Sequence, residues 1–111
     1  MDKLEAFRAM VEEHTKARFI AEWERDGKTY PLEVHANAWP CKIKIGRKYA
    51  NVDVGQSGKY MVVLDTGEIY GIKGYGVVNR NHFYGTLDTI HEWDWSDYTA
   101  RKFSEISKIA A

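Results

Sequence analysis

The stretch KYMVVLDTGEIYGI (residues 59–72) determines the centre of the expected fold. Its two β-forming runs, Lys59–Leu64 and Glu68–Ile72, flank the tripeptide Asp65-Thr66-Gly67. A three-residue loop ending in glycine is typical of a β-hairpin, because glycine adopts the positive φ angle that such a turn requires. The stretch therefore predicts an antiparallel hairpin.

Two further strands are expected on the N-terminal side of this hairpin. Polar and apolar residues alternate in Lys42–Ile45 and again in Ala50–Val54, and Gly46 interrupts the pattern between them. This arrangement fits two short strands or one bulged strand. Gly55–Gly58 then predicts the turn that leads into the central hairpin.

The N-terminus has the pattern of an amphipathic helix. From Asp2 to about Arg18, apolar residues recur at steps of three and four, beginning with Leu4, Phe7 and either Met10 or Val11. Good helix formers dominate this segment, and Asp2 is a suitable N-cap. Periodicity and propensity therefore both predict a helix.

The dipeptide Asp26-Gly27 allows two interpretations. As a tight turn it would join strands over Phe19–Glu24 and Lys28–Val34, with Pro31 placing the second strand at an edge or in a bulge. Alternatively, the N-terminal helix continues through Trp23. The hairpin is the favoured interpretation, because Asp-Gly is a strong turn signal.

The C-terminal third is expected to add helices. Asn79–Asn81 is a polar turn, and Gly85–Trp95 could form one short helix capped by Thr86. Ser96 is a suitable N-cap for a last helix over Asp97–Ile109. The whole chain, residues 1–111, then forms a single α+β domain with an N-terminal helix, a small antiparallel sheet of four to five strands, a short helix and a C-terminal helix.

Composition restricts the class of protein. The chain has 111 residues, of which 44% are apolar, and this is enough for one packed core and too much for a disordered chain. No apolar run approaches the roughly 18 residues that cross a bilayer. We therefore expect a cytoplasmic protein without membrane contact. The single cysteine, Cys41, cannot form an internal disulfide and is best interpreted as a buried structural residue.

The motifs of the chain do not favour an enzyme. The segment GQSGKY (residues 55–60) lacks both the glycine spacing of a phosphate-binding loop and the hydroxyl residue after its lysine. The segment HEWDW (residues 91–95) lacks the second histidine of a zinc-protease helix. We therefore expect no catalytic residues, no cofactor and no metal. A small hydrolase or nucleotide-handling protein that uses His82, His91 and Asp88 is a third class of function.

Aromatic residues are frequent in the second half of the chain. The four Trp, seven Tyr and four Phe exceed what a small sheet and two helices must bury, and Tyr and Trp are favoured at recognition surfaces. They predict a protein-binding surface on the C-terminal half. The residues proposed to contact a partner are Tyr70, Tyr75, Phe83, Tyr84, Trp93 and Trp95.

Charge is unevenly distributed, although 16 basic and 16 acidic residues balance overall. Residues 28–60 have six basic and two acidic side chains, a net charge of +4, and each flanking segment has a net charge of −2. Basic side chains beside aromatic rings fit single-stranded nucleic acid, which we keep as the alternative function. The nucleic-acid-binding residues would be Lys42, Lys44, Arg47, Lys48, Lys59 and Tyr60.

Several segments resemble small uncharacterised proteins encoded by bacteriophages and other mobile elements. The resemblance covers about residues 46–95 and includes Gly46–Gly55, Ser57–Met61, Thr66–Ile72 and Tyr84–Asp88. It implies no catalytic residues. Small phage proteins often bind host proteins, so the resemblance implies a non-enzymatic protein that occludes a host protein, for example as an inhibitor of a bacterial defence system such as CRISPR. An open sheet edge would also allow a homodimer.

Overall fold

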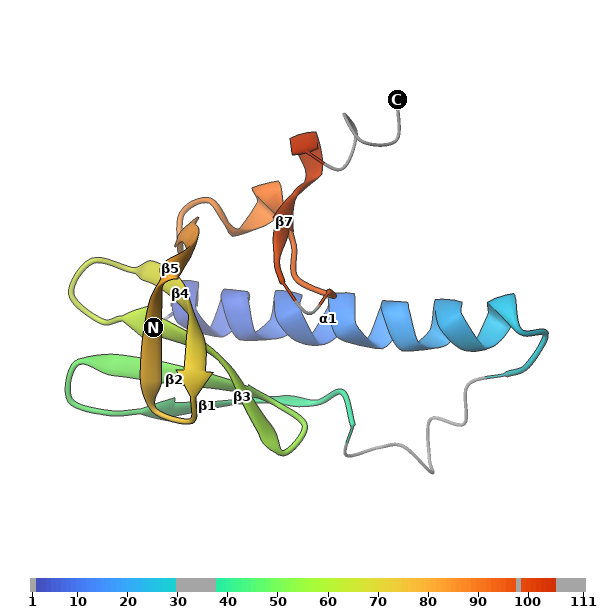
Figure 1. The fold of residues 1–111 in the computed structure, drawn as a ribbon, viewed down its shortest axis with the longest axis horizontal. Coiled ribbons are helices and arrows are strands. Elements are labelled where there is room, and N and C mark those ends of the chain that lie inside the picture. The colour runs from blue at the N-terminus through green and yellow to red at the C-terminus, as the bar shows by residue number, and fades with distance from the viewer. Residues whose placement is uncertain (1, 30–37, 98, 106–111) are drawn as a thin grey trace.

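The computed structural model describes residues 2–29, 38–97 and 99–105. It begins with a long helix, α1 (Asp2–Arg25). Five strands follow: β1 (Cys41–Ile45), β2 (Tyr49–Val54), β3 (Ser57–Val63), β4 (Glu68–Gly74) and β5 (Val77–Thr86). The last elements are a 3₁₀ turn, η1 (Ile90–Glu92), the short strands β6 (Trp93–Asp94) and β7 (Arg101–Lys102), and a helical segment at residues 103–105. The expected α+β class is confirmed (Figure 1).

The five strands form one antiparallel meander in which each strand pairs with the next along the chain. The turn between β3 and β4 is closed by Gly67, which has a φ angle of +77° and donates its N–H to the carbonyl of Val63 at 2.7 Å. The hairpin predicted from residues 59–72 is therefore confirmed. Of the two alternatives for the residues before it, two short strands or one bulged strand, the structure has two strands, β1 and β2.

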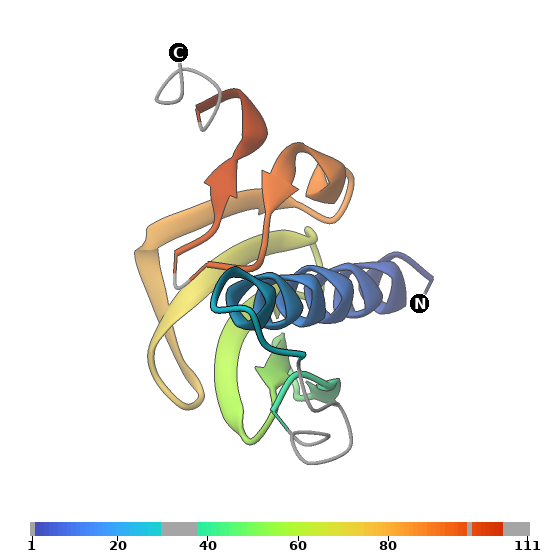
Figure 2. The same cartoon turned by 90° about the vertical axis from the view of Figure 1, so that its right-hand side faces the viewer.

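α1 packs its apolar side on one face of the sheet, here called the inner face. Leu4, Phe7 and Val11 are buried, as the helical periodicity predicts. The sheet curves around α1, and the β6–β7 hairpin lies beyond the end of β5 (Figure 2). Trp95 follows β6 and completes the core, where its ring meets that of Phe7 edge to face with 4.7 Å between centroids.

The predicted strand over Phe19–Glu24 is wrong, and the helix continues through this segment to Arg25. Asp26-Gly27 ends the helix instead of forming a hairpin turn. Gly27 has a φ angle of +75° and donates to the Glu24 carbonyl, while the Lys28 N–H donates to the Trp23 carbonyl. This pair of bonds is the Schellman motif, which satisfies carbonyls at the end of a helix. Residues 30–34 of the predicted Lys28–Val34 strand lie outside the described residues.

Two expectations for the C-terminal third are wrong, and the expected C-terminal helix begins later than predicted. Asn79–Asn81 lies within β5, and the segment 85–95 contains the end of β5, η1 and the extended strand β6 instead of one helix. The predicted helix does not begin at Asp97, because residues 101–102 form β7 and helical structure begins only at residue 103. Ser96 is not a helix cap, because its N–H and Oγ both donate to Asp94 Oδ1, at 3.0 and 2.7 Å. The end of the predicted helix, residues 106–109, lies outside the described residues.

No helix in the described ranges combines the length and the apolar composition needed to cross a bilayer.

Candidate functional site

Four of the six aromatic residues predicted to contact a partner lie in the interior. They are Tyr70, Tyr84, Trp93 and Trp95. The Tyr84 ring contacts Tyr60 at 5.8 Å and Trp93 at 5.7 Å, and Trp93 stacks on Trp95 at 5.8 Å between centroids. The rings of Tyr84, Trp93 and Trp95 fill the space between the sheet and the β6–β7 hairpin. Tyr70 is buried elsewhere, beside Phe83, with 5.4 Å between the ring centroids. The aromatic excess therefore serves packing at these four positions.

The other two aromatic residues, Tyr75 and Phe83, are exposed on the outer face, the sheet face opposite α1. Their exposed fractions are 54% and 48%. Tyr75 packs over Gly58, where a Cβ atom would approach the tyrosine Cδ1 to 2.6 Å. The Tyr75 hydroxyl donates to Asp53 Oδ2 at 3.3 Å. Gly58 therefore provides the space in which the Tyr75 ring lies.

Four of the predicted nucleic-acid-binding residues are exposed on β1 and the turn after it: Lys42, Lys44, Arg47 and Lys48. Lys42 and Lys44 alternate onto the outer face, where Lys42 lies directly opposite Asp53 in the register of β1 and β2. The Lys44 ammonium is 6.0 Å from the centre of the Tyr75 ring. Basic and aromatic groups are thus brought together at this position.

Lys59 and Tyr60 do not join this surface. A register shift makes Tyr60 pair with Val52 and Gly58 pair with Asp53, which leaves Lys59 as the extra residue of a bulge. Lys59 Nζ and Tyr60 Oη both donate to the carbonyl of Trp95, at 3.2 and 3.4 Å, so both side chains lie on the inner face. Simple alternation places Lys59 on the outer face, and the bulge is the reason that it does not lie there.

An apolar groove lies beside the N-terminal end of α1, and residue patterns did not indicate it. Its volume is about 560 Å³, and its lining consists of Lys3, Leu4, Ile45, Val62, Val63, Leu64 and Leu87. Ile45 and Leu64 are 60% and 40% exposed although both side chains are apolar. The lining comes from α1, β1, β3 and the segments after β3 and β5, so only the fold assembles the groove.

Charged side chains flank this groove. The Leu64 N–H donates to the Lys48 carbonyl at 3.0 Å, which holds the β1–β2 turn beside the groove. Among the described residues, neither Arg47 nor Lys48 forms an ion pair. Lys3 also lines the groove, and its ammonium pairs with Asp88 at 2.5 Å. The β1–β2 turn therefore presents two unpaired cations next to exposed apolar side chains.

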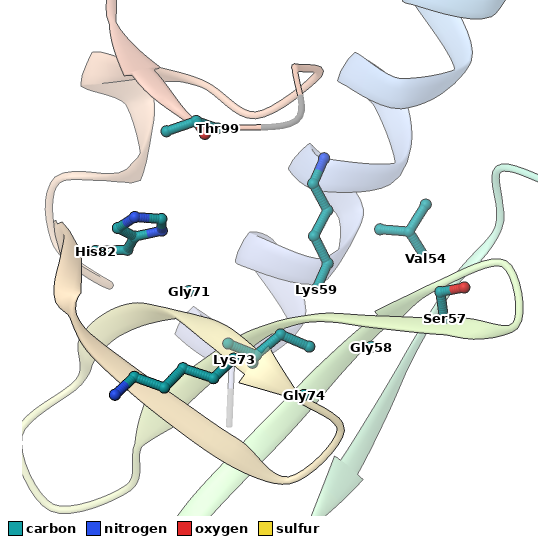
Figure 3. Close-up of a pocket in the computed structure, with 10 residues that line it drawn as sticks. Val54, Ser57, Gly58, Lys59, Gly71, Lys73, Gly74, His82 and Thr99 are labelled. Atoms are coloured by element: carbon teal, nitrogen blue, oxygen red, sulfur yellow. The ribbon is translucent and has the colours of Figure 1, made fainter.

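A second cavity, of about 450 Å³, lies on the inner face near the ends of β3, β4 and β5. Lys59 and His82 stand on opposite sides of the space above Gly71, and Thr99 lies over that space (Figure 3). Lys73 also lines the cavity, but its side chain extends away from this space. No carboxylate lines the cavity within the described part of the chain.

The groups considered for catalysis are not assembled. No hydrogen bond or ion pair joins His82, His91 and Asp88. Burial, together with the charge of Glu12, raises the pKa of the Cys41 thiol to about 12, so this thiol is a poor nucleophile at neutral pH. In the ranges that the structure describes, no group of three or more His, Cys, Asp or Glu side chains could hold a metal ion.

Comparison with known proteins finds no matching family model, no matching curated protein and no matching solved structure. The function is therefore argued from the geometry of this chain.

Proposed function

We propose that this protein is a non-enzymatic binding protein that occludes a host protein by receiving one of its segments in the apolar groove. The observation that carries this proposal is the lining of the groove, in which six of the seven described residues are apolar. Ile45 and Leu64 expose much of their surface to water there. Apolar surface gathered in one place and bordered by charged residues is typical of protein contact sites.

The charge beside the groove defines the chemistry of the partner segment. Arg47 and Lys48 are exposed and have no ion-pair partner among the described residues, so a segment with apolar side chains flanked by Asp or Glu would complement both the groove and its border. The resemblance of residues 46–95 to phage-encoded proteins makes a bacterial defence protein, such as a CRISPR effector, the first class of partner to test.

The test is co-purification from a bacterial lysate treated with nuclease, followed by reconstitution with the purified partner. We expect the wild-type protein to retain a stoichiometric protein, and Ile45→Glu or Leu64→Glu to weaken its dissociation constant at least tenfold. A carboxylate placed in the groove disrupts apolar contact and would repel the acidic flanks of the partner. Arg47→Glu should weaken binding less, because it acts at the border.

The matched control is Val77→Glu, which introduces the same charge at an apolar residue that is 53% exposed and does not line the groove. This variant should bind the partner as the wild type does. A partner that binds the two groove variants as tightly as it binds Val77→Glu would contradict the proposal, and so would the absence of any stoichiometric protein partner.

A second candidate function is single-stranded nucleic-acid binding on the outer face. One observation favours it, namely that the exposed Lys44 lies beside the exposed Tyr75 ring, with the exposed Lys42 on the same face of β1. Ammonium groups neutralise phosphates and a tyrosine ring can stack on a base. This function ranks second because Asp53 lies within the same group and because Lys59 and Tyr60 are turned to the inner face.

Fluorescence anisotropy with labelled single-stranded DNA and RNA tests this second function. We expect binding to weaken steeply with salt, and the double variant Lys42→Gln and Lys44→Gln to reduce both the affinity and the salt dependence. Lys73→Gln, on another strand, is the control. Binding that does not change with salt, or that is equal in both variants, would exclude this function.

A further inference from the structure

The cavity between Lys59 and His82 is separate from the groove and has the composition of a ligand site. Its volume of about 450 Å³ lies within the range of small-molecule sites. The titratable groups in its lining are Lys59, Lys73 and His82, and the described carboxylates that act on Lys59, those of Asp94 and Asp97, lie outside the lining. Any charge that this lining carries is therefore positive.

Lys59 is the first of the two groups at the centre of the cavity. An ammonium has three N–H donors, and the one hydrogen bond of Lys59 in the described chain goes to the Trp95 carbonyl at 3.2 Å. Burial lowers the pKa of Lys59, which is the effect expected of a cation that has lost part of its water. An anionic acceptor in the cavity would occupy the remaining donors and restore the lost stabilisation.

His82 is placed opposite Lys59 by an irregularity in β5. Asn79 pairs with Gly71 and Phe83 pairs with Tyr70, so residues 80–82 have no partner in β4 and the strand bends there. The bend turns His82 to the inner face, where its Cβ is 3.0 Å from the position that a Cβ atom on Gly71 would occupy. Glycine at position 71 therefore gives the imidazole its place beside the cavity.

We propose that this cavity binds a small organic anion, a phosphate monoester or a carboxylate, with its anionic group between Lys59 and His82. Both anions offer oxygen acceptors, and these form strong charge-assisted hydrogen bonds with an ammonium. Val54 and Ile72 provide apolar surface for the rest of the molecule. The site lies outside the groove and the outer face. The binding of a small anion there therefore does not depend on the proposed macromolecular partner.

The experiment is a titration of the ¹⁵N-labelled protein followed by amide chemical shifts. The probes are phenyl phosphate, benzoate and benzyl alcohol, which share an aromatic ring and differ in charge. We expect phenyl phosphate or benzoate to shift the amides of Gly58, Gly71 and His82 in a saturable manner, and benzyl alcohol to bind at least tenfold more weakly. The probe that binds more tightly shows whether the site prefers a phosphate or a carboxylate group.

Two variants test the assignment of the residues. Lys59→Met keeps the length of the side chain and removes its charge, and should weaken binding of the anion at least tenfold. Lys73→Met removes an equal charge from a side chain that points away from the cavity centre, and should change the affinity less than twofold. If Lys59→Met does not give a folded spectrum, His82→Ala at an exposed position should show a similar loss.

Several results would overturn the proposal. These are no saturable shift with either anion, equal affinity of the wild type and the cavity variant, benzyl alcohol binding as tightly as the anions, or shifts confined to the groove around Ile45 and Leu64.

Discussion

His14 lies on α1 and links the helix to the β6–β7 hairpin. Its Nδ1 accepts a hydrogen bond from the Trp95 N–H at 3.0 Å, so the bonded form of the ring is neutral, with its proton on Nε2. Burial lowers the pKa of His14 below 6.5, although the Asp94 carboxylate, 3.9 Å away, opposes this shift. The folded protein therefore binds this proton less tightly than the unfolded chain does.

We expect the free energy of unfolding to decrease as the pH falls below about 6.5. In this range the unfolded chain takes up the His14 proton before the folded protein does, so acidification favours unfolding. Urea unfolding at pH 8, 7, 6 and 5 measures this dependence. His14→Gln retains a hydrogen-bond acceptor without a titrating group, and its stability should change less over the same range. An identical pH dependence in both proteins would contradict this role of His14.

The end of α1 shows that the structure formed by the dipeptide Asp26-Gly27 depends on the segment that precedes it. Asp-Gly readily forms a hairpin turn, but here it follows a segment that continues as helix, with an ion pair between Arg18 and Glu22 at 3.0 Å along its surface. The glycine then takes the C′ position of the helix. The same positive φ angle serves both structures, so the dipeptide alone does not distinguish them.

Gly27→Ala should decrease the free energy of unfolding by about 1–2 kcal/mol, the cost of a left-handed conformation for a residue with a Cβ atom. Among the described residues beyond the two chain neighbours, no heavy atom lies within 4 Å of the position of that Cβ, so the cost comes from the backbone alone. The control is Gly74→Ala, where the space is also open and φ is not positive. If the two variants were equally stable in urea unfolding, the left-handed conformation of residue 27 at the end of α1 would be contradicted.

One hydrophobic core joins α1, the sheet and the β6–β7 hairpin into a single structure. Phe7 is fully buried and contacts Tyr60 of β3 at 5.6 Å and Trp95 at 4.7 Å between ring centroids. The side chain thus touches all three parts of the structure. Such a shared core predicts that the described parts unfold together.

Phe7→Ala should decrease the free energy of unfolding by about 3–5 kcal/mol, the usual effect of removing a buried phenyl ring. Circular dichroism and tryptophan fluorescence should report one coincident transition. Phe7→Leu is the milder variant if the alanine variant does not fold. Phe103→Ala, at a phenylalanine that is 46% exposed, should cost less than about 1 kcal/mol. Separate transitions of helix and sheet would disprove the single core.

Less of the candidate sites than of the fold could be predicted from the sequence. Tyr84, Trp93 and Trp95 are core residues, because the β6–β7 hairpin, which contains the two tryptophans, folds back over the sheet. A bulge turns Lys59 to the inner face, and the alternation of polar and apolar residues along the strand does not predict this bulge. The apolar groove and the cavity are each lined by residues from several elements, so no short motif indicates either of them.

Local sequence patterns were sufficient to predict the α+β class, the apolar side of α1 and the hairpin over residues 59–72, because these depend on the spacing of neighbouring residues and on the φ angle of a glycine. Tertiary structure alone decided the end of α1, the path of the chain after β5 and the exposure of each aromatic and basic side chain. Burial and bulges depend on which distant segments meet, and local patterning contains no record of those contacts.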